Sequence, residues 1–314
     1  LTTSGVLTIS DADLGDGSFI AQPSVAGNNG YGTFTLDATG NWTYTAADNQ
    51  AVIQHLGAGQ SLTDSFTAKS LDGTAQQTVT VTIHGQNDAP SIAAATLPAF
   101  DEDTAQTPVS VASMFAGKFS DIDNGSSLAG IAVNLSSGPS SDIVGTWQYS
   151  TDNGSHWSSI GPFGQSNMVL VLSTATLLKF VPVQDYNGGA SISAYGIDDS
   201  YTGGFTGASP VTLDFSAANS TGGSTPFSAA QTSISTTVNA VDDAPRFSNL
   251  GPAAAATEQT STVLDSDLNA TVFDPELHQL AFTGGNWAGA TLTVARHGGA
   301  NDEDSFGIDS TLGS

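Results

Sequence analysis

The sequence predicts an all-β protein built from antiparallel β-sandwich modules in tandem, because it shows alternating strand patterns, turn signals between them and a repeated joint. In the clearest strand, at 78–83, Val79, Val81 and Ile83 alternate with threonines. This is the period of a half-buried strand rich in β-branched residues. Comparable patterns occur at 31–36, 42–45, 147–150, 168–172 and 191–195.

Turn signals separate these strands. Asn and Gly, which accept the positive φ that hairpins need, occur at 37–41, 152–154 and 186–189. Only short helices are expected, at 47–56 and 111–115. Many short strands joined by such turns favour antiparallel sandwiches.

A repeated joint divides the chain into three modules. The segment 83–90 (IHGQNDAP) is matched at 238–245 (VNAVDDAP). The strands that enter the joints match in phase, with Val79, Val81 and Ile83 corresponding to Ile234, Thr236 and Val238. We therefore expect a sandwich over 1–88 that lacks its first strand, a sandwich over 89–243 and an incomplete module over 244–314.

The composition favours cations as partners. Five Lys and Arg against thirty Asp and Glu give a net charge of −25, although only 11% of the residues are charged. A field of this sign repels phosphate backbones and anionic lipid headgroups, which excludes nucleic-acid binding and electrostatic membrane docking. The chain has no cysteine, so it has neither disulfides nor a thiolate metal site.

The acidic residues gather near the joints, where their oxygens are candidate Ca²⁺ ligands. For the first joint the best candidates are Asn87, Asp88, Glu102, Asp103, Asp121 and Asp123, with Asp11, Asp13 and Asp72 in the module before it. For the second joint the candidates are Asp198, Asp199, Asp242, Asp243, Glu258, Asp274 and Glu276. A single Asp-x-Asp pair is usually a solvated turn, so the recurrence at both joints carries this prediction.

Several motifs resemble modules of giant bacterial adhesins. GVLTISDAD, YGTFTLDATGNWTY, LGAGQSLTDSF and QTVTVTIHGQNDAP, all within residues 1–90, resemble a VCBS repeat, an immunoglobulin-like module. FDEDT, FSDIDNG, GTWQYSTDNGSHW, LLKFVPVQDYNGG and YGIDD look like a bacterial cadherin-like domain, apart from a Gly/Ser/Thr-rich insertion at 203–232. Residues 244–314 are similar to a third module of such chains.

The resemblance implies a non-enzymatic segment of an RTX-type adhesin that is secreted, or displayed on the bacterial surface, by type I secretion. Its immunoglobulin- and cadherin-like sandwiches would form an extended rod that Ca²⁺ stiffens, and it would contribute to cell adhesion and biofilm formation. Its partners would be the neighbouring modules of the same chain, with surface glycans or other cells reached through distal modules. No membrane insertion of this segment is expected.

Two alternatives remain open at this stage. In a carbohydrate-binding module, the inserted loops of the second unit and an exposed Trp157 would contact sugar, although strand-spaced aromatics are more often core. These aromatics are Trp42, Tyr44, Trp147, Tyr149, Trp157 and Phe180. A self-processing module would cleave after Asp274, before Pro275. No nucleophile elbow, metalloprotease helix or nucleotide-binding loop is present, so the sequence predicts no enzyme.

Overall fold

In the computed structural model the chain divides into two compact units, Leu1–Ala240 and Val241–Ser314. The structure describes residues 1–12, 17–136, 138, 143–162, 164–244, 246–249 and 271–273. The first unit contains two sandwiches with separate cores, one filled by residues between 19 and 83 and the other by residues between 95 and 238. Each unit is described by itself.

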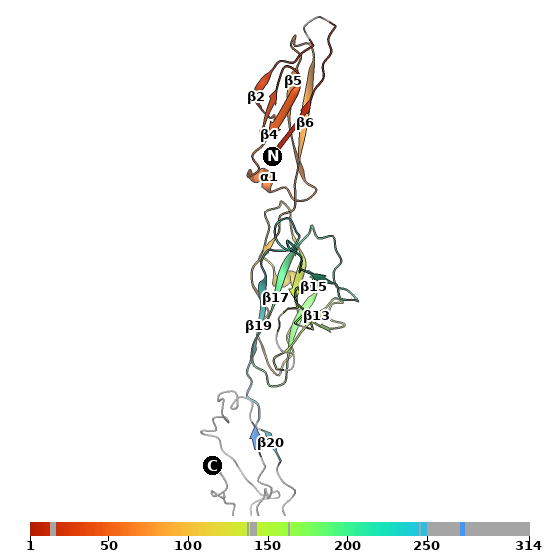
Figure 1. The fold of residues 1–314 in the computed structure, drawn as a ribbon. Helices are drawn as coiled ribbons and strands as arrows, with labels where there is room; N and C mark the ends of the chain where they lie inside the picture. Colours follow the sequence, from red (N-terminus) through yellow and green to blue (C-terminus); the bar gives the residue numbers. More distant parts are fainter. Residues whose placement is uncertain are drawn as a thin grey trace, which may run out of the picture. The chain divides into compact units, whose positions relative to one another are not determined.

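The first sandwich pairs a four-stranded sheet with a two-stranded one (Figure 1). Its elements are β1 (Thr2–Val6), β2 (Gln22–Ala26), β3 (Thr33–Leu36), β4 (Asn41–Thr45), α1 (Ala51–Gln54), β5 (Ser61–Lys69) and β6 (Gln76–His84). The sheets run β1-β4-β3-β2 and β5-β6. Between them Phe34 packs 4.5 Å from Tyr44 and 4.6 Å from Phe66, measured between ring centroids. These buried aromatic contacts hold the two sheets together.

The second sandwich is larger (Figure 1). Its elements are β7 (Ser91–Ile92), β8 (Ala95–Thr96), β9 (Phe100–Asp101), β10 (Val109–Ser110), α2 (Val111–Met114), β11 (Phe119–Ser120), β12 (Leu128–Asn134), β13 (Gly145–Ser150), β14 (Ser158–Ser159), β15 (Met168–Ser173), β16 (Leu177–Pro182), β17 (Gly188–Asp198), β18 (Thr212–Asp214) and β19 (Thr232–Asn239). One sheet runs β18-β15-β12-β17-β19-β8, with β9 also on β19, and faces the sheet β10-β16-β13-β14. Trp147 and Phe180, 5.5 Å apart, lie in the core between them.

The Gly/Ser/Thr-rich insertion at 203–232 packs on the outer face of the large sheet. Phe205 and Phe227 belong to a second apolar cluster that covers Val169, Val171 and Ile197. Phe227 is held by Tyr201 and Phe215 through edge-to-face ring contacts. The sheet is therefore buried on both faces, and its central strands carry near-continuous apolar runs instead of strict alternation.

The second unit is described only in part. Strand β20 (Arg246–Ser248) pairs antiparallel with β21 (Thr271–Phe273). The expected ligands Glu258, Asp274 and Glu276 lie outside the described residues, as does Asp13 in the first unit.

The local expectations from the sequence are confirmed. All six predicted strands form, both short helices lie inside their predicted ranges, and Gly40 and Gly154 adopt positive φ in the turns. Of the six aromatic residues, Tyr44, Trp147, Tyr149 and Phe180 are core, and Trp42 and Trp157 are half-buried. The all-β fold of antiparallel sheets is therefore established.

Candidate functional site

Five polar residues meet where the first sandwich passes into the second, and we call them the acidic joint: Asn87, Asp88, Asp121, Asp123 and Asp198. Asn87 and Asp88 follow β6, and Asp121 and Asp123 follow β11. Asp198 is the last residue of β17. Segments distant in sequence therefore contribute to one place.

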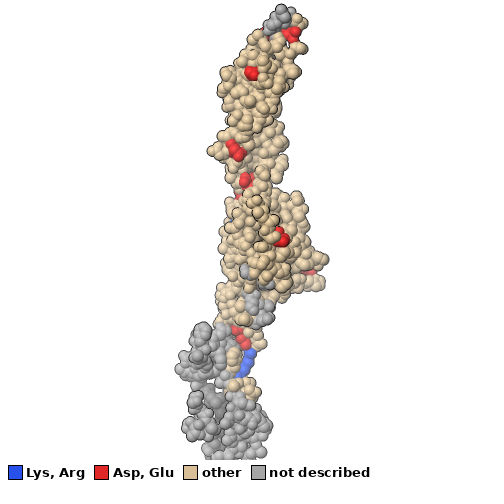
Figure 2. Space-filling model, in the orientation of Figure 1, with Lys and Arg blue, Asp and Glu red and all other residues tan. Residues whose placement is uncertain are grey.

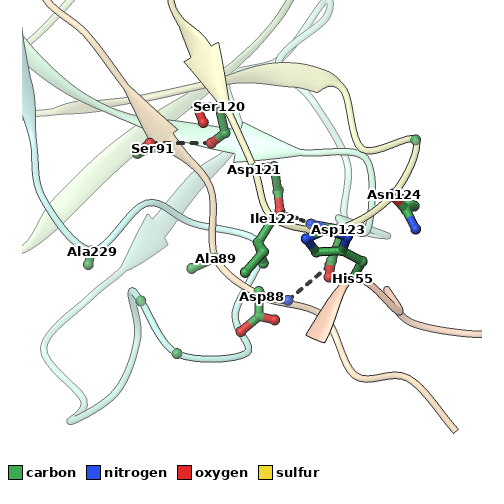
Figure 3. A pocket seen from close by; sticks show the side chains of 13 residues that line it. His55, Asp88, Ala89, Ser91, Ser120, Asp121, Ile122, Asp123, Asn124 and Ala229 are labelled. Carbon is green, nitrogen blue, oxygen red and sulfur yellow. Dashed lines mark hydrogen bonds between the residues drawn. The ribbon is translucent and has the colours of Figure 1, made fainter. Parts of the chain in front are cut away.

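Hydrogen bonds tie the linker to the second sandwich. The Asn87 Nδ2 donates to Asp198 Oδ2 at 3.1 Å and to the Thr225 carbonyl at 3.2 Å. The Asp88 N–H donates to Asp123 Oδ2 at 3.0 Å, as Figure 3 shows. Hydrogen bonds at both Asn87 and Asp88 therefore tie the linker to the second sandwich.

The loop that carries Asp121 and Asp123 also contacts the first sandwich. The Asn124 N–H donates to the His55 carbonyl at 3.0 Å, and Gln60 Nε2 donates to the Asn124 carbonyl at 2.9 Å. Asp121 Oδ1 accepts the Asp123 N–H at 2.9 Å and so holds the loop in shape. An open hollow of about 790 Å³ lies over this loop and the linker (Figure 3).

Asp123 has the least favourable electrostatic setting in the joint. Its side chain is only 8% exposed. Burial raises its pKa above 3.8, and the neighbouring charges of Asp121, Asp88 and Asp198 raise it further, although the Asp88 N–H works in the opposite direction. Its Oδ1 is buried and accepts no hydrogen bond within the described part of the chain. Among the described residues, no positively charged group contacts this oxygen.

The donor set fits a hard divalent cation, because it consists of carboxylate and amide oxygens with one buried oxygen unsatisfied. No three His, Cys, Asp or Glu side chains in the described ranges are arranged to hold a metal ion. The carboxylates of the acidic joint would have to draw together around it. On the face shown in Figure 2, acidic side chains form separate small patches on a largely neutral surface.

Glu102 and Asp103 do not lie at the first joint, so their expected placement is wrong. Strand β9 pairs in parallel with the end of β19, and the Glu102 N–H donates to the Asn239 carbonyl at 3.1 Å. By residue 101 the chain has run the length of the second sandwich. These acids therefore lie at its far end.

The expected placement of Asp198 and Asp199 is also wrong, because they lie at the first joint and not at the second. We expected them at the second joint, but β17 runs antiparallel to β19 and ends at the first joint. Asp198 there accepts from Asn87, and Asp199 accepts the Ser127 N–H at 3.3 Å. The end of the second sandwich at which these acids lie depends on strand direction, which the local sequence does not reveal.

Asp72 and Asp11 also lie away from the joint. Asp72 is in the turn of the β5–β6 hairpin, whose strands pair from Ser61–His84 to Lys69–Gln76, so that turn is at the other end of the sandwich. Its carboxylate accepts from Ser70 and Thr74. Asp11 lies near Gly17, in a segment that packs at this same end of the first sandwich, away from the joint. Asp242 and Asp243 belong to the second unit.

Sequence reasoning missed Asp64, a fully buried carboxylate in β5. Its oxygens accept the backbone N–H groups of Asn29, Tyr31, Gly32 and Ser65 and the hydroxyl of Tyr44. A Cβ on Gly27 would collide with this carboxylate. The signal was present, because Asp64 occupies the same strand face as buried Phe66 and Ala68.

The first module is similar to a known domain family. Residues 1–85 match the family model of the bacterial cadherin-like domain. The bacterial cadherin-like family expected from the sequence is therefore found, but the match lies on residues 1–85, where the sequence resembled a VCBS repeat, and not on residues 89–243, where the cadherin-like resemblance was placed. Domains of this type are typical of adhesion-related extracellular proteins.

Solved cadherin ectodomains are among the similar structures. PcdhgB3 EC1-4 matches with 13% identity and a TM-score of 0.35, covering 81% of this chain and 49% of its own. The cadherin domains 1-4 of protocadherin gamma B7 match with 10% identity and a TM-score of 0.32, covering 88% and 50%. The chain spans about half the length of these structures. No curated protein matches. No helix in the described residues could cross a membrane.

Proposed function

We propose that this segment is a calcium-stiffened spacer of a bacterial adhesin, secreted or held at the cell surface, that contributes to cell adhesion and biofilm formation. The observation that carries the proposal is the unsatisfied Asp123 Oδ1, buried beside three further carboxylates at a joint between two sandwiches. The bacterial cadherin-like family of residues 1–85 supports the adhesive setting. Export by type I secretion from an RTX-type parent is part of the same proposal.

The residues of the acidic joint would hold the ion. Ca²⁺ takes about 6–8 oxygen ligands, and a bound ion would supply the positive charge that the acidic joint lacks. Asp88 belongs to the linker, Asp123 to a loop that contacts the first sandwich, and Asp198 to the central sheet of the second. Joining these three carboxylates restricts rotation about the linker. Asp242 and Asp243 are proposed as further Ca²⁺ ligands.

The first test is thermal melting of the whole chain in calcium and in chelator. At a free concentration of about 100 times the dissociation constant, one site adds about 2.7 kcal/mol to the folded state. We expect a higher Tm in calcium for the parent chain, and loss of that increase in Asp123→Asn. Asp72→Asn is the matched control, because Asp72 lies at the opposite end of the first sandwich. Equal increases in both variants would remove the acidic joint as the site.

The second test is small-angle scattering under the same two conditions. A stiffened joint gives a longer and narrower distribution of interatomic distances in calcium than in chelator. Superimposable curves, with a Tm that calcium does not move, would overturn the spacer proposal.

The carbohydrate-binding alternative finds little support at Trp157. Lys179 Nζ lies 4.0 Å from the centroid of the indole ring, and the Trp157 Nε1 donates to the Gly154 carbonyl at 3.1 Å. The ring is therefore engaged in cation–π and turn contacts. Asp274, on which the self-processing alternative rests, lies outside the described residues.

A further inference from the structure

Two short strands near the start of the second sandwich run parallel to its last strand. Strand β19 pairs with β8 at Ala95 and Thr96 and with β9 at Phe100 and Asp101. The chain enters this sandwich ahead of β8 and β9, and it leaves after β19 to continue into the second unit. A pull on the two ends of the sandwich therefore draws β8 and β9 one way and β19 the other way, along their shared direction.

This arrangement places the hydrogen bonds between the strands under shear. The Leu97 N–H donates to the Ser235 carbonyl at 2.8 Å. The Glu102 N–H donates to the Asn239 carbonyl at 3.1 Å. Because the bonds of a parallel pair are evenly spaced and cross between the strands, sliding one strand past the other strains all of them together. Strands separated from one end would instead lose their bonds one after another, each at a lower force.

A buried glutamine side chain reinforces the same contact. Gln106 and Thr236, which lies in β19, are both almost fully buried. The Gln106 Nε2 donates to Thr236 Oγ1 at 2.7 Å and to the carbonyl of Pro98, between β8 and β9, at 3.0 Å. The Gln106 Oε1 accepts the N–H of Phe180, from β16 in the facing sheet, at 2.6 Å. One side chain thus joins the start of the sandwich, its last strand and the opposite sheet.

Side chains at the two ends of the contact add further bonds. The hydroxyl oxygens of Thr96 and Ser235 lie 3.4 Å apart where β8 meets β19. The Asn239 Nδ2 donates to Asp101 Oδ1 at 3.1 Å where β9 meets β19. The contact is therefore bonded along its whole length, from β8 to the end of β9.

We propose that the second sandwich is a tension-resisting module, in which the contact of β8 and β9 with β19, held by Gln106, opposes a pull on its ends. Because Gln106 fixes Pro98 to Thr236, this contact must break before the strands within 107–235 bear the tension. The bonds of Gln106 are shielded from water, which strengthens them and raises the barrier that sets the rate of forced unfolding. The inference rests on the proposed function in one respect, since a spacer between two attached bodies is stretched at its ends.

Single-molecule pulling on the whole chain tests the direction of this resistance. The sequence has no cysteine, so two introduced cysteines define the points of attachment. Ala94→Cys with Ala240→Cys draws β8 and β19 past one another, whereas Asp103→Cys with Ala240→Cys separates the adjacent ends of β9 and β19. All three positions are exposed. We expect the first pair to unfold the sandwich at a severalfold higher force, and equal forces for the two pairs would overturn the proposal.

Variants in the core test the role of Gln106 with the Ala94 and Ala240 attachments. Gln106→Met removes the amide and should make unfolding at constant force about tenfold faster. Leu172→Ala is the matched control, because it opens a cavity in the same core on β15, outside the contact. It should lower the Tm at least as much but accelerate forced unfolding less. Equal acceleration by both variants would remove Gln106 from the proposal.

Thr236→Val keeps the test decisive if Gln106→Met does not fold. It removes only the hydroxyl that bonds to Gln106 and to the Pro98 carbonyl. It should accelerate forced unfolding in the same direction and by a smaller factor. An unchanged rate would contradict the assigned role of the Gln106 contact.

Repeating the pulls in calcium and in chelator separates this inference from the calcium proposal. The contact contains no residue of the acidic joint, so the ratio of the two forces should be the same in both solutions. A high ratio together with a Tm that calcium does not move would support the tension-resisting module and overturn the calcium-stiffened joint. A difference between the two attachments that appears only in calcium would overturn the present inference.

Discussion

Asp64 in the first sandwich and Asp123 at the acidic joint are both buried carboxylates, yet their pKa values move in opposite directions. Burial alone would raise the pKa of Asp64, but backbone N–H groups and the Tyr44 hydroxyl outweigh it and lower the value below 3.8. Burial also raises the pKa of Asp123, where only the Asp88 N–H opposes it and neighbouring carboxylates add to it.

The difference separates a structural carboxylate from a candidate binding one. Asp64 is surrounded by donors that belong to the fold, so its charge is compensated without any ligand. In the described part of the chain, the Asp123 carboxylate has one donor and one unsatisfied oxygen. A buried acid is therefore informative about ligands only after its hydrogen-bond donors have been counted.

The largest effect is expected from Asp64→Ala. Removal of the carboxylate leaves several buried N–H groups without an acceptor, and this should lower the free energy of unfolding of the first sandwich by about 3–5 kcal/mol. Urea unfolding followed by tyrosine and tryptophan fluorescence measures it. A loss below about 1 kcal/mol would show that water replaces the carboxylate, against the compensation described above.

Asp123→Asn in chelator should change the free energy of unfolding by a smaller amount and in the opposite direction. The substitution removes a desolvated charge repelled by Asp121, Asp88 and Asp198, and should stabilise the chain by about 1 kcal/mol. Thermal melting in chelator measures it. Destabilisation there would mean that Asp123 already has a compensating partner, and the contrast with Asp64 would disappear.

In chelator, lowering the pH should destabilise the region around Asp64 and stabilise the region around Asp123. The folded-state pKa of Asp64 is depressed, so its contribution to stability is present at neutral pH and is lost only as pH falls below 3.8 and through the lowered pKa. The folded-state pKa of Asp123 is raised, so protonation relieves its penalty as pH falls. Amide exchange at pH 6, pH 4 and pH 3 should show tightening around the loop after β11 first, and loosening around β5 only at pH 3. Parallel changes in both regions would contradict the assigned shifts.

An effect similar in size to that of Asp123→Asn is expected from Tyr44→Phe. The Tyr44 hydroxyl donates to Asp64 Oδ2 at 3.2 Å, and burial together with the Asp64 charge raises the pKa of Tyr44 to about 12. Loss of this one bond should cost about 1 kcal/mol, because the backbone donors remain. Spectrophotometric titration of tyrosine should lose the component near pH 12 that Tyr44 contributes, while burial keeps the pKa of Tyr201 raised in both proteins. If that component persists, another tyrosine carries the raised pKa.

Local features of the fold could be predicted from the sequence. The strand at 78–83 and the turn at 37–41 depend on residues within a few positions of each other, and both form as expected. The buried phase of β19, with Ile234, Thr236 and Val238 inside, also follows from alternation alone. The alternation in β5 also places Asp64 on the buried face, which we did not predict, and only the structure shows the donors that satisfy it.

The sequence by itself was enough to assign Asn87, Asp88, Asp121 and Asp123 to the first joint. Which other acids join them was decided by tertiary structure, because it depends on strand direction. β17 returns Asp198 to the first joint, whereas β9 carries Glu102 to the far end. Side-chain periodicity is a property of neighbouring residues, but the meeting of distant residues is set by the pairing of whole strands.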